Sequence, residues 1–353
     1  MAVIFGGYWE EREVSVESAR TMIPALQADS DAGPGLEVIP VRWDFDGWTV
    51  LGSDADLLDP GVAGHPLEVL ADLRRTGLGV VFNALHGGPG EDGSLQGLLE
   101  VSGTPYTGAS VHASAVSMNK ETFRERVKAL GYEVAAGGVI HRNDWLATPN
   151  EILTAVSVEV GLPAVVKPVA SGSSCGIHLC KDTESLTRAL DDALGRDRSV
   201  LVEQFISGRE VSIPCLGTRV GVPPEVLPIV EIESLNESGF FDYEAKYDAT
   251  QARETVPASL DPELQRHLED LAVAVHEDLE LGGVSRTDVI IGADGPVVLE
   301  TQTVPGYTAE SLLPKCAAAA GIDLTALGRR LIDYALSAYL SRGAEALPAG
   351  SEE

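Results

Sequence analysis

We predict that this chain is an α/β and α+β protein of three domains. Its 353 residues exceed what one hydrophobic core usually supports. The apolar run at residues 80–85 is continuous, as in a parallel strand that is buried on both faces. The runs at 161–167 and 200–206 instead contain a single lysine and a single glutamate, respectively. The strand pattern of the first third of the chain therefore differs from that of the rest, which predicts a different type of domain.

The first domain, residues 1–108, is predicted to be an open α/β unit. Glu13 and Glu17 stand near the start of an expected helix, where the helix dipole favours anions. The connecting segments are rich in Asp, Gly and Pro. The expected elements are strands at 2–7, 38–41 and 80–85, helices at 15–26 and 94–101, and loops at 27–36 and 52–66.

The second domain, residues 109–206, is predicted to be a small α+β unit. The third domain, 207–345, carries further strands and the last helices, and 346–353 are expected to be a frayed tail. Residues 236–251 are polar and aromatic without a clear period. The expected elements are helices at 117–130, 185–194 and 261–280, two helices separated by 321–323, and strands at 161–167, 177–180, 200–206, 209–216 and 226–233.

Charge and composition narrow the class of function. The net charge of −29 makes nucleic acid and anionic membranes poor partners, because both need concentrated Lys and Arg. No apolar stretch is long enough to span a bilayer, and the N-terminus lacks the basic start of a signal peptide. The four cysteines are too sparse for a disulfide framework. We therefore expect a cytoplasmic protein.

The segment from Arg286 to Gly306 carries the clearest sign of chemistry. Apolar runs flank a Gly-Ala-Asp-Gly turn at 292–295, which places Asp288 and Glu300 on adjacent antiparallel strands. Oxygen ligands presented in this way suit Mg²⁺, which shares its remaining positions with phosphate oxygens. An ordinary hairpin with surface acids is the alternative.

Two glycine-rich turns are candidates for binding anions. Residues 86–93 match the Gly-x-Gly-x-x-Gly pattern, but Glu91 and Asp92 would repel a pyrophosphate and no acid follows at the spacing that holds a ribose. A dehydrogenase is therefore rejected, and a small carboxylate fits the helix start better. Residues 170–176 follow Lys167 and form a turn that can fold over phosphate, with a structural hairpin turn as the alternative.

The order of these motifs resembles the D-alanine–D-alanine ligases of the ATP-grasp superfamily, from Val3 to about Leu340. One motif alone is weak, but the whole series in the same order is specific. The matching segments are Gly6-Gly7 with 11–15, 84–97, 105–108, Ser117-Met-x-Lys120, 166–168, Gly172-Ser-Ser-x-Gly176, 242–247, Arg286-x-Asp288-Val and Pro305-Gly306-x-Thr308.

The resemblance implies a three-domain ATP-grasp fold with an N-terminal open α/β (pre-ATP-grasp) domain. It implies an ATP- and Mg²⁺-dependent ligase that forms D-alanyl-D-alanine through an acyl phosphate and releases ADP and phosphate, for peptidoglycan precursor synthesis. ATP is expected between the central and C-terminal domains, with two Mg²⁺ ions that Mn²⁺ can replace. Relatives are commonly dimers, so a homodimer is expected.

The resemblance also implies roles for single residues around the nucleotide and at the reacting centre. Arg286 and the Gly306 N–H would hold the tetrahedral oxyanion. The metal ligands would be Asp288, Glu300 and Gln302. The nucleotide would meet Lys120, Lys167, Ser174, Glu203, Glu210 and Lys246.

Around the amino acids, Glu11 would pair with the first ammonium and would close the site together with Ser173 and Tyr247. His86 would lie near the first substrate, with a structural hydrogen bond as its alternative role. Ser311 and Leu312 would bind the second substrate's carboxylate at a helix N-terminus.

Departures from the family pattern concern the second amino acid. Gln302 replaces asparagine, Tyr307 replaces Met or Phe, and Glu310 replaces a neutral residue or His. The carboxylate of Glu310 should repel a second substrate unless it faces away or pairs with a cation. A dipeptide ligase of a secondary-metabolite or resistance pathway, with another second amino acid, is therefore the alternative. A nucleotide-binding module without ligase activity is a further one.

Overall fold

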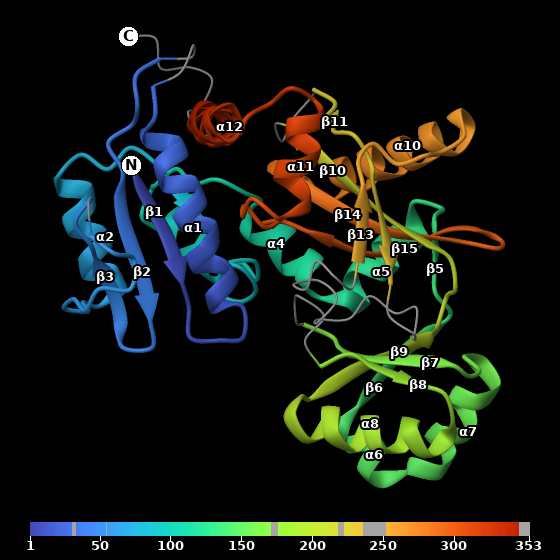
Figure 1. Ribbon diagram of the computed structural model, residues 1–353. Coiled ribbons are helices and arrows are strands. Elements are labelled where there is room, and N and C mark those ends of the chain that lie inside the picture. The colour runs from blue at the N-terminus through green and yellow to red at the C-terminus, as the bar shows by residue number, and fades with distance from the viewer. Residues whose placement is uncertain (30–32, 54, 171–175, 218–221, 236–251, 346–353) are drawn as a thin grey trace.

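In the part of the chain that the structure describes, the strands form three β-sheets, each covered by helices (Figure 1). The computed structural model describes residues 1–29, 33–53, 55–170, 176–217, 222–235 and 252–345, without the side chains of 342–345. Within these ranges, no helix combines the length and apolar character that crossing a bilayer requires.

The N-terminal sheet has the strand order β3-β2-β1-β4, with β1 parallel to both β2 and β4. Val3 and Phe5 point to one hydrophobic core, whereas Ala2 and Ile4 point to another, so β1 is buried on both faces. The elements are β1 (Ala2–Gly6), α1 (Arg12–Gln27), β2 (Ile39–Asp44), β3 (Gly47–Val50), α2 (Pro66–Arg75), β4 (Val81–Asn83) and α3 (Ser94–Val101).

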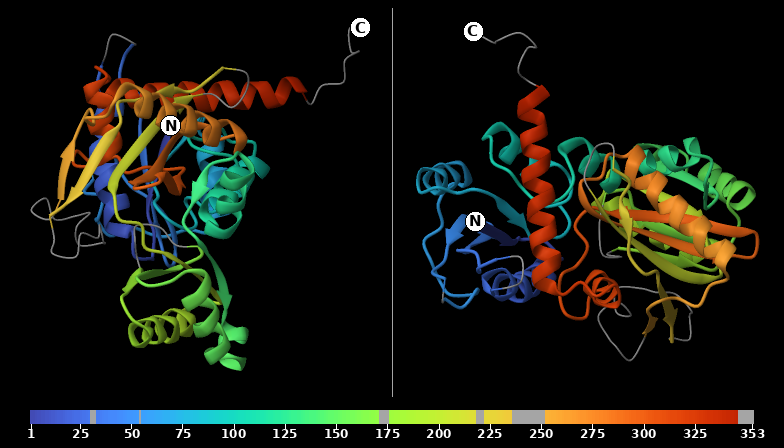
Figure 2. Two further views of the ribbon diagram at one scale, coloured as in Figure 1. Left: turned by 90° about the vertical axis from the view of Figure 1, so that its right-hand side faces the viewer. Right: turned by 90° about the horizontal axis from the view of Figure 1, so that it is seen from above.

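The last helix, α12 (Leu324–Glu345), ties this unit to the C-terminal part. Figure 2 shows it running between the two. Its residues Leu327 and Leu331 share one core with Met22 and Leu26 of α1. A Cβ at Gly328 would lie 2.7 Å from Leu26 Cδ2 and 2.9 Å from Met22 Cε, so glycine permits this close approach.

The large sheet has the order β13-β12-β10-β14-β15-β5, and β11 pairs with β10. Its elements are α4 (Val111–Met118), α5 (Lys120–Ala129), β5 (Glu133–Val134), β10 (Arg209–Gly217), β11 (Glu225–Val226), β12 (Val230–Ser234), β13 (Ala252–Thr255), α10 (Pro262–Asp278), β14 (Gly283–Gly292), β15 (Gly295–Gln302) and α11 (Leu312–Ala319).

Helices α4, α5 and α10 belong to this sheet. Phe123 and Val127 of α5 share a core with Val211 of β10 and Val275 of α10. Because β5 also joins this sheet, we propose that the small domain begins near residue 136 rather than at 109.

Two element predictions were wrong. The expected helix at 117–130 is interrupted, because Asn119 ends α4 and its side chain accepts the Thr122 N–H at 3.0 Å as the cap of α5. The expected strand at 226–233 is two strands, β11 and β12. The elements β3 and α2 were not predicted.

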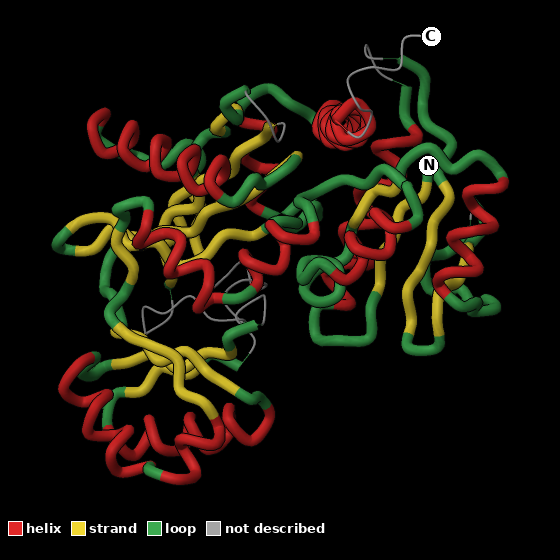
Figure 3. Tube along the Cα trace, turned by 180° about the vertical axis from the view of Figure 1, so that it is seen from behind, coloured by secondary structure: helices red, strands yellow, loops and turns green. Residues whose placement is uncertain are grey.

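The small sheet is antiparallel in the order β6-β9-β7-β8, with its helices on the side away from the large sheet (Figure 3). Ala164 and Val166 of β7 point to the core under these helices, whereas Val165 and Lys167 point the other way, into a cavity. The elements are β6 (Gly137–His141), α6 (Arg142–Ala147), α7 (Pro149–Glu159), β7 (Ala164–Pro168), β8 (His178–Cys180), α8 (Thr183–Arg196) and β9 (Ser199–Gln204).

Candidate active site

Two cavities meet beside strand β14. The larger, of about 580 Å³, is lined by residues of the N-terminal unit and of the large sheet, including Glu11, Arg286 and Ser311. The smaller, of about 370 Å³, lies between the small sheet and the large sheet. Glu210 and Asp288 line both cavities. A reaction that joins molecules from the two cavities would occur at these residues.

The hairpin β14–β15 places the predicted reactive side chains on one face. Arg286 pairs in register with Gln302, and Asp288 pairs with Glu300, so the prediction of two carboxylates on adjacent antiparallel strands is confirmed. Arg286 Nε and Nη2 donate to the Asp288 carboxylate at 2.9 and 2.7 Å. Ser212 of β10 donates to the same carboxylate at 2.6 Å.

The charge of Arg286 is stabilised where it lies. Burial disfavours the guanidinium, but Asp288, Glu300 and Glu210 raise the pKa of Arg286 far above its usual range. The guanidinium therefore stays protonated and can face a developing negative charge.

The oxygen donors of this face suit Mg²⁺. Asp288 and Glu300 supply carboxylates and Gln302 an amide carbonyl, and Lys120 Nζ lies 3.6 Å from Glu300 Oε2. In the parts of the chain that the structure describes, no group of three or more His, Cys, Asp or Glu side chains could hold a metal. Two carboxylates and one amide carbonyl are few protein ligands, which is typical of Mg²⁺ that also takes phosphate oxygens.

The smaller cavity combines an apolar wall with a buried ion pair. Phe205, Ile206 and Leu299 contribute apolar surface. At its floor the Glu203 carboxylate contacts Lys167 Nζ and accepts from Arg124 Nη1 at 2.8 Å.

Sequence reasoning missed Arg124. The sequence pattern that could have identified it is the spacing of Lys120, Arg124 and Val127. This spacing places two cations on the core-facing side of α5. Cations on a buried face predict a buried acidic partner.

The inner end of the larger cavity is lined by Glu11, His86 and Glu91, all of them buried. A Cβ at Gly87 would lie 1.9 Å from Glu11 Oε2, and Gly87 has φ of +69°. Only glycine allows the loop to pass this close to the carboxylate. Burial, together with the nearby Glu11, raises the pKa of Glu91 to about 8.

His86 uses both ring nitrogens inside the protein. Nδ1 lies 3.0 Å from the Val304 carbonyl and Nε2 lies 2.8 Å from Ser18 Oγ. Burial, and to a smaller extent Arg286, lower the pKa of His86 to about 4, so the ring is neutral near pH 7. Both nitrogens of His86 therefore have the structural hydrogen-bonding role that was the alternative prediction. The ring of His86 also lines the cavity.

The glycine loop at 86–93 binds the chain's own carboxylates, which corrects the expectation of a bound substrate carboxylate there. Glu91 accepts the N–H groups of Gly87 at 2.8 Å and Val304 at 2.9 Å. Asp92 accepts the N–H of Ser94 at 2.8 Å, at the start of α3. Glu91 thus links the N-terminal unit to the segment after β15.

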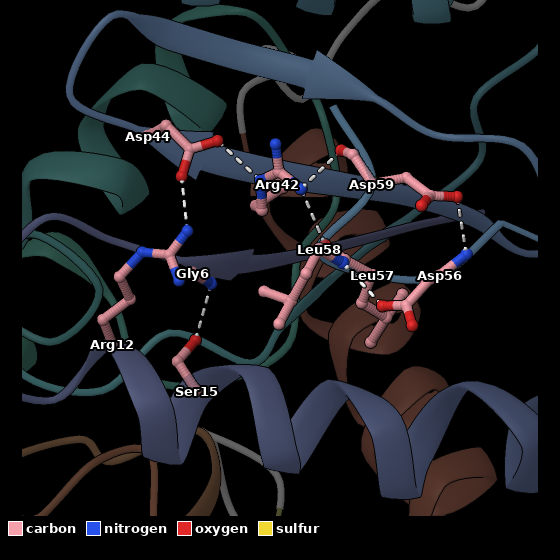
Figure 4. A network of polar contacts seen from close by, with 9 residues as sticks. All are labelled: Gly6, Arg12, Ser15, Arg42, Asp44, Asp56, Leu57, Leu58 and Asp59. Carbon is pink, nitrogen blue, oxygen red and sulfur yellow. Dashed lines mark hydrogen bonds and ion pairs between the residues drawn. The ribbon is translucent and has the colours of Figure 1, made fainter. Parts of the chain in front are cut away.

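A polar network next to Glu11 fixes the start of α1 (Figure 4). Arg12 donates to Asp44 at 2.8 Å, and Arg42, which also contacts Asp44, donates to the carbonyls of Leu57 and Asp59. Burial disfavours the Asp44 carboxylate, but the two arginines still lower the pKa of Asp44. Glu11 is therefore held next to an anchored residue.

The outer end of the larger cavity contains Ser311, which precedes α11. Its hydroxyl lies 2.8 Å from Thr308 Oγ1 and accepts the Thr308 N–H at 3.2 Å. A Cβ at Gly306 would lie 2.5 Å from Ser311 Oγ. Leu312 begins the helix and lines the same cavity.

Glu310 does not stand unpaired in this region. Lys315 Nζ lies 3.1 Å from Glu310 Oε2 and donates to Glu254 Oε2 at 2.7 Å. Burial disfavours the ammonium, but these two carboxylates raise the pKa of Lys315. Four predicted site residues lie outside the described part of the chain: Ser173, Ser174, Lys246 and Tyr247.

Comparison with family models matches nearly the whole chain. The model of the D-ala D-ala ligase N-terminus matches residues 1–109, and the model of the D-ala D-ala ligase C-terminus matches residues 127–333. The chain is 35% identical to a D-alanine–D-alanine ligase of Moorella thermoacetica, over 95% of this chain and 99% of the relative. It is 37% identical to one of Actinobacillus pleuropneumoniae, over 94% and 97%.

Solved structures support the same fold. The D-alanine–D-alanine ligase of Coxiella burnetii has a TM-score of 0.79 at 24% identity, covering 98% of this chain and 95% of that one. The ligase of Bacillus anthracis, solved in complex with ATP, has a TM-score of 0.74 at 28% identity, covering 97% and 98%. The predicted ATP-grasp fold is confirmed.

Proposed function

Because the chain belongs to the D-alanine–D-alanine ligase family, we propose that it joins two D-alanines at the expense of ATP, for peptidoglycan precursor synthesis. A relative has been solved in complex with ATP, and in this chain we place ATP in the smaller cavity, which Lys167, Glu203 and Glu210 line. The two amino acids occupy the larger cavity.

In the first step, a carboxylate oxygen of the first D-alanine attacks the γ-phosphorus. A C–O–P linkage forms, the bond to the bridging β-phosphate oxygen breaks, and ADP leaves with that electron pair. Glu11 holds the substrate ammonium, and the buried anchoring of α1 keeps its carboxylate in place. Lys120 and Lys167 face the added negative charge on the phosphates.

In the second step, the neutral amine of the second D-alanine attacks the acyl carbon. A C–N bond forms, the tetrahedral oxyanion collapses, phosphate leaves with its electron pair, and the amine releases a proton. Arg286 and the Gly306 N–H stabilise the oxyanion, since both line the larger cavity next to Asp288.

Mg²⁺, when held by Asp288, Glu300 and the amide carbonyl of Gln302, neutralises phosphate oxygens and so favours phosphoryl transfer. Gln302 is one methylene longer than the usual asparagine, and it still presents its carbonyl on the face of β15 that carries Glu300. We also propose a homodimer, from the family alone. A cytoplasmic location is supported by Cys180, Cys215 and Cys316, which are buried and free.

One observation carries the proposal: Arg286, Asp288 and Glu300 share one face of a hairpin at the point where the two cavities meet. A purely structural hairpin would have no reason to bury a guanidinium and an aspartate, with a second acid next to them, beside two cavities. This arrangement supplies charge of both signs where a phosphoryl and then an acyl group are transferred.

Phosphate release from ATP, measured across a panel of D- and L-amino acids with mass detection of the products, tests the proposal. We expect release with D-alanine alone and a D-alanyl-D-alanine product. Release only with a mixed pair would instead identify a dipeptide ligase with another second amino acid. If no amino acid stimulates release, a nucleotide-binding module is the better description.

A further inference from the structure

The larger cavity is acidic, although it must admit a second carboxylate. Its described lining contains six acidic side chains and two basic ones: Glu11, Glu91, Glu210, Glu254, Asp288 and Glu310 against Arg286 and Lys315. Arg286 is bound through two nitrogens to Asp288. Lys315 also contacts carboxylates, but one of them, Glu310, has a largely exposed side chain, whereas the Asp288 partner of Arg286 is buried. Of these two lining cations, Lys315 is therefore better able to attract an incoming carboxylate.

Lys315 lies next to the second-substrate end of this cavity. It follows Ser311 by one turn of α11, and its N–H donates to the Ser311 carbonyl at 3.4 Å. The two side chains thus lie on the same side of the helix. Ser311 in turn lies against Gly306.

The two carboxylates that hold Lys315 differ in exposure. The Glu254 side chain is 22% exposed and belongs to β13, so the sheet fixes its position. The Glu310 side chain is 85% exposed and lies farther from the ammonium, at 3.1 Å. An exposed ion pair of this kind is weak, because water screens it and the side chain loses entropy on pairing.

We propose that Lys315 binds the carboxylate of the second amino acid and that Glu310 occupies this position until the substrate displaces it. Glu254 is the positioning residue that keeps the ammonium at the cavity wall. Glu310 thereby neutralises Lys315 in the empty site and competes with the substrate in the filled one. The proposal rests on the proposed function and adds a specificity determinant to it.

The test compares D-alanine with D-alaninamide, which keeps the amine but lacks the carboxylate, as the second substrate. Both are present together in one reaction with saturating ATP, with D-alanine also serving as the first substrate, and both dipeptide products are quantified by mass. The ratio of the two products at equal concentrations of D-alanine and D-alaninamide equals the ratio of their kcat/KM values as second substrates. The ratio of kcat/KM for D-alanine over D-alaninamide then reports recognition of the carboxylate. A general loss of folding or of ATP binding would not change this ratio.

Lys315→Met is expected to lower this ratio about tenfold, the size of a partly exposed charge-assisted contact. Lys315→Arg should restore most of it. Glu310→Gln should lower the KM for the second D-alanine about two- to fivefold. Because Glu310 is exposed, this substitution should not affect folding. Lys128→Met, at an exposed lysine on α5, is the matched control and should change nothing.

An unchanged ratio in Lys315→Met overturns the proposal, as does an unchanged or higher KM in Glu310→Gln. Failure of the ligase function itself is a different result, because the unmodified protein would then release no phosphate with D-alanine.

Discussion

At the scale of single residues, buried acids carry both structure and chemistry. Glu91 accepts N–H groups from Gly87 and Val304, which are far apart in the sequence, and it lies near Glu11. Burial opposes the ionisation of Glu91, and the charge of Glu11 adds to this effect. The result is a carboxyl group that favours the protonated form in the folded protein.

This group makes stability depend on pH. The pKa of Glu91 is about 8 in the folded protein, against an ordinary value of 4.5. Between pH 4.5 and pH 8 the folded state therefore binds one more proton at Glu91 than the unfolded state does. The stabilisation is therefore complete below pH 4.5 and is lost as the pH rises through 8. In Glu91→Gln, the free energy of unfolding relative to the unmodified protein should rise from pH 5 to pH 8, by up to about 1.4 kcal/mol per pH unit.

Urea unfolding at several pH values measures this difference. Glu151→Gln removes the same charge at an exposed position and is the control. Parallel pH profiles for the unmodified protein and Glu91→Gln would show that Glu91 ionises normally.

At the scale of elements, the hairpin β14–β15 was predictable and its supporting residues were not. The apolar runs around residues 292–295 indicate both strands, and the period of two then fixes which side chains share a face. Contacts between distant segments leave no local signal. Ser212 and Arg124 each meet a site residue only through tertiary packing.

Local capping explains the errors in the element predictions. Asn119 interrupts a helical pattern because its side chain caps the second helix, and periodicity alone does not register this. The short strand β3 lies within a segment of mixed polarity. The first boundary of the small domain depends on β5, which is only two residues long.

The two hairpin carboxylates should respond differently to neutralisation. Both Glu300→Gln and Asp288→Asn should lower kcat at least about a hundredfold, because each weakens phosphate charge compensation. Asp288→Asn also leaves the buried Arg286 without its carboxylate partner, which should cost about 3–5 kcal/mol of stability. The Glu300 side chain is more exposed, so Glu300→Gln should lower the stability only a little.

Phosphate-release kinetics and thermal unfolding of both variants check this expectation. Near-normal turnover in Glu300→Gln would refute its assignment as a metal ligand. Equal stability of the two variants would contradict the dependence of Arg286 on Asp288.

At the scale of the whole molecule, the N-terminal unit is joined to the rest by a shared core. Val3 and Phe5 of β1, residues of α1 and residues of α12 bury one another. The larger cavity, in which we place the amino acids, lies along this junction, since Glu11 and Ser311 come from its two sides. The lining of this cavity thus comes from segments that are far apart in the sequence.

Gly328 tests this junction. Gly328→Val adds a Cβ and two methyl groups next to Leu26 and Met22, which are fully buried. We expect a loss of about 1–3 kcal/mol in the free energy of unfolding, typical of overpacking. Gly195→Val in α8, where a Cβ meets nothing within 4 Å, is the control and should stay within about 0.5 kcal/mol.

Denaturant unfolding of both variants measures these free energies. A Gly328→Val variant as stable as the control would show that α1 and α12 can separate without loss.

The bond from the Val304 N–H to Glu91 has a consequence for recombination between relatives. A chimera that takes residues 1–109 from one ligase and the remainder from another inherits the two halves of this contact from different parents. Such hybrids will work when the acceptor loop and the segment after β15 are exchanged together. In evolutionary terms, the two ends of the chain are expected to change as one unit.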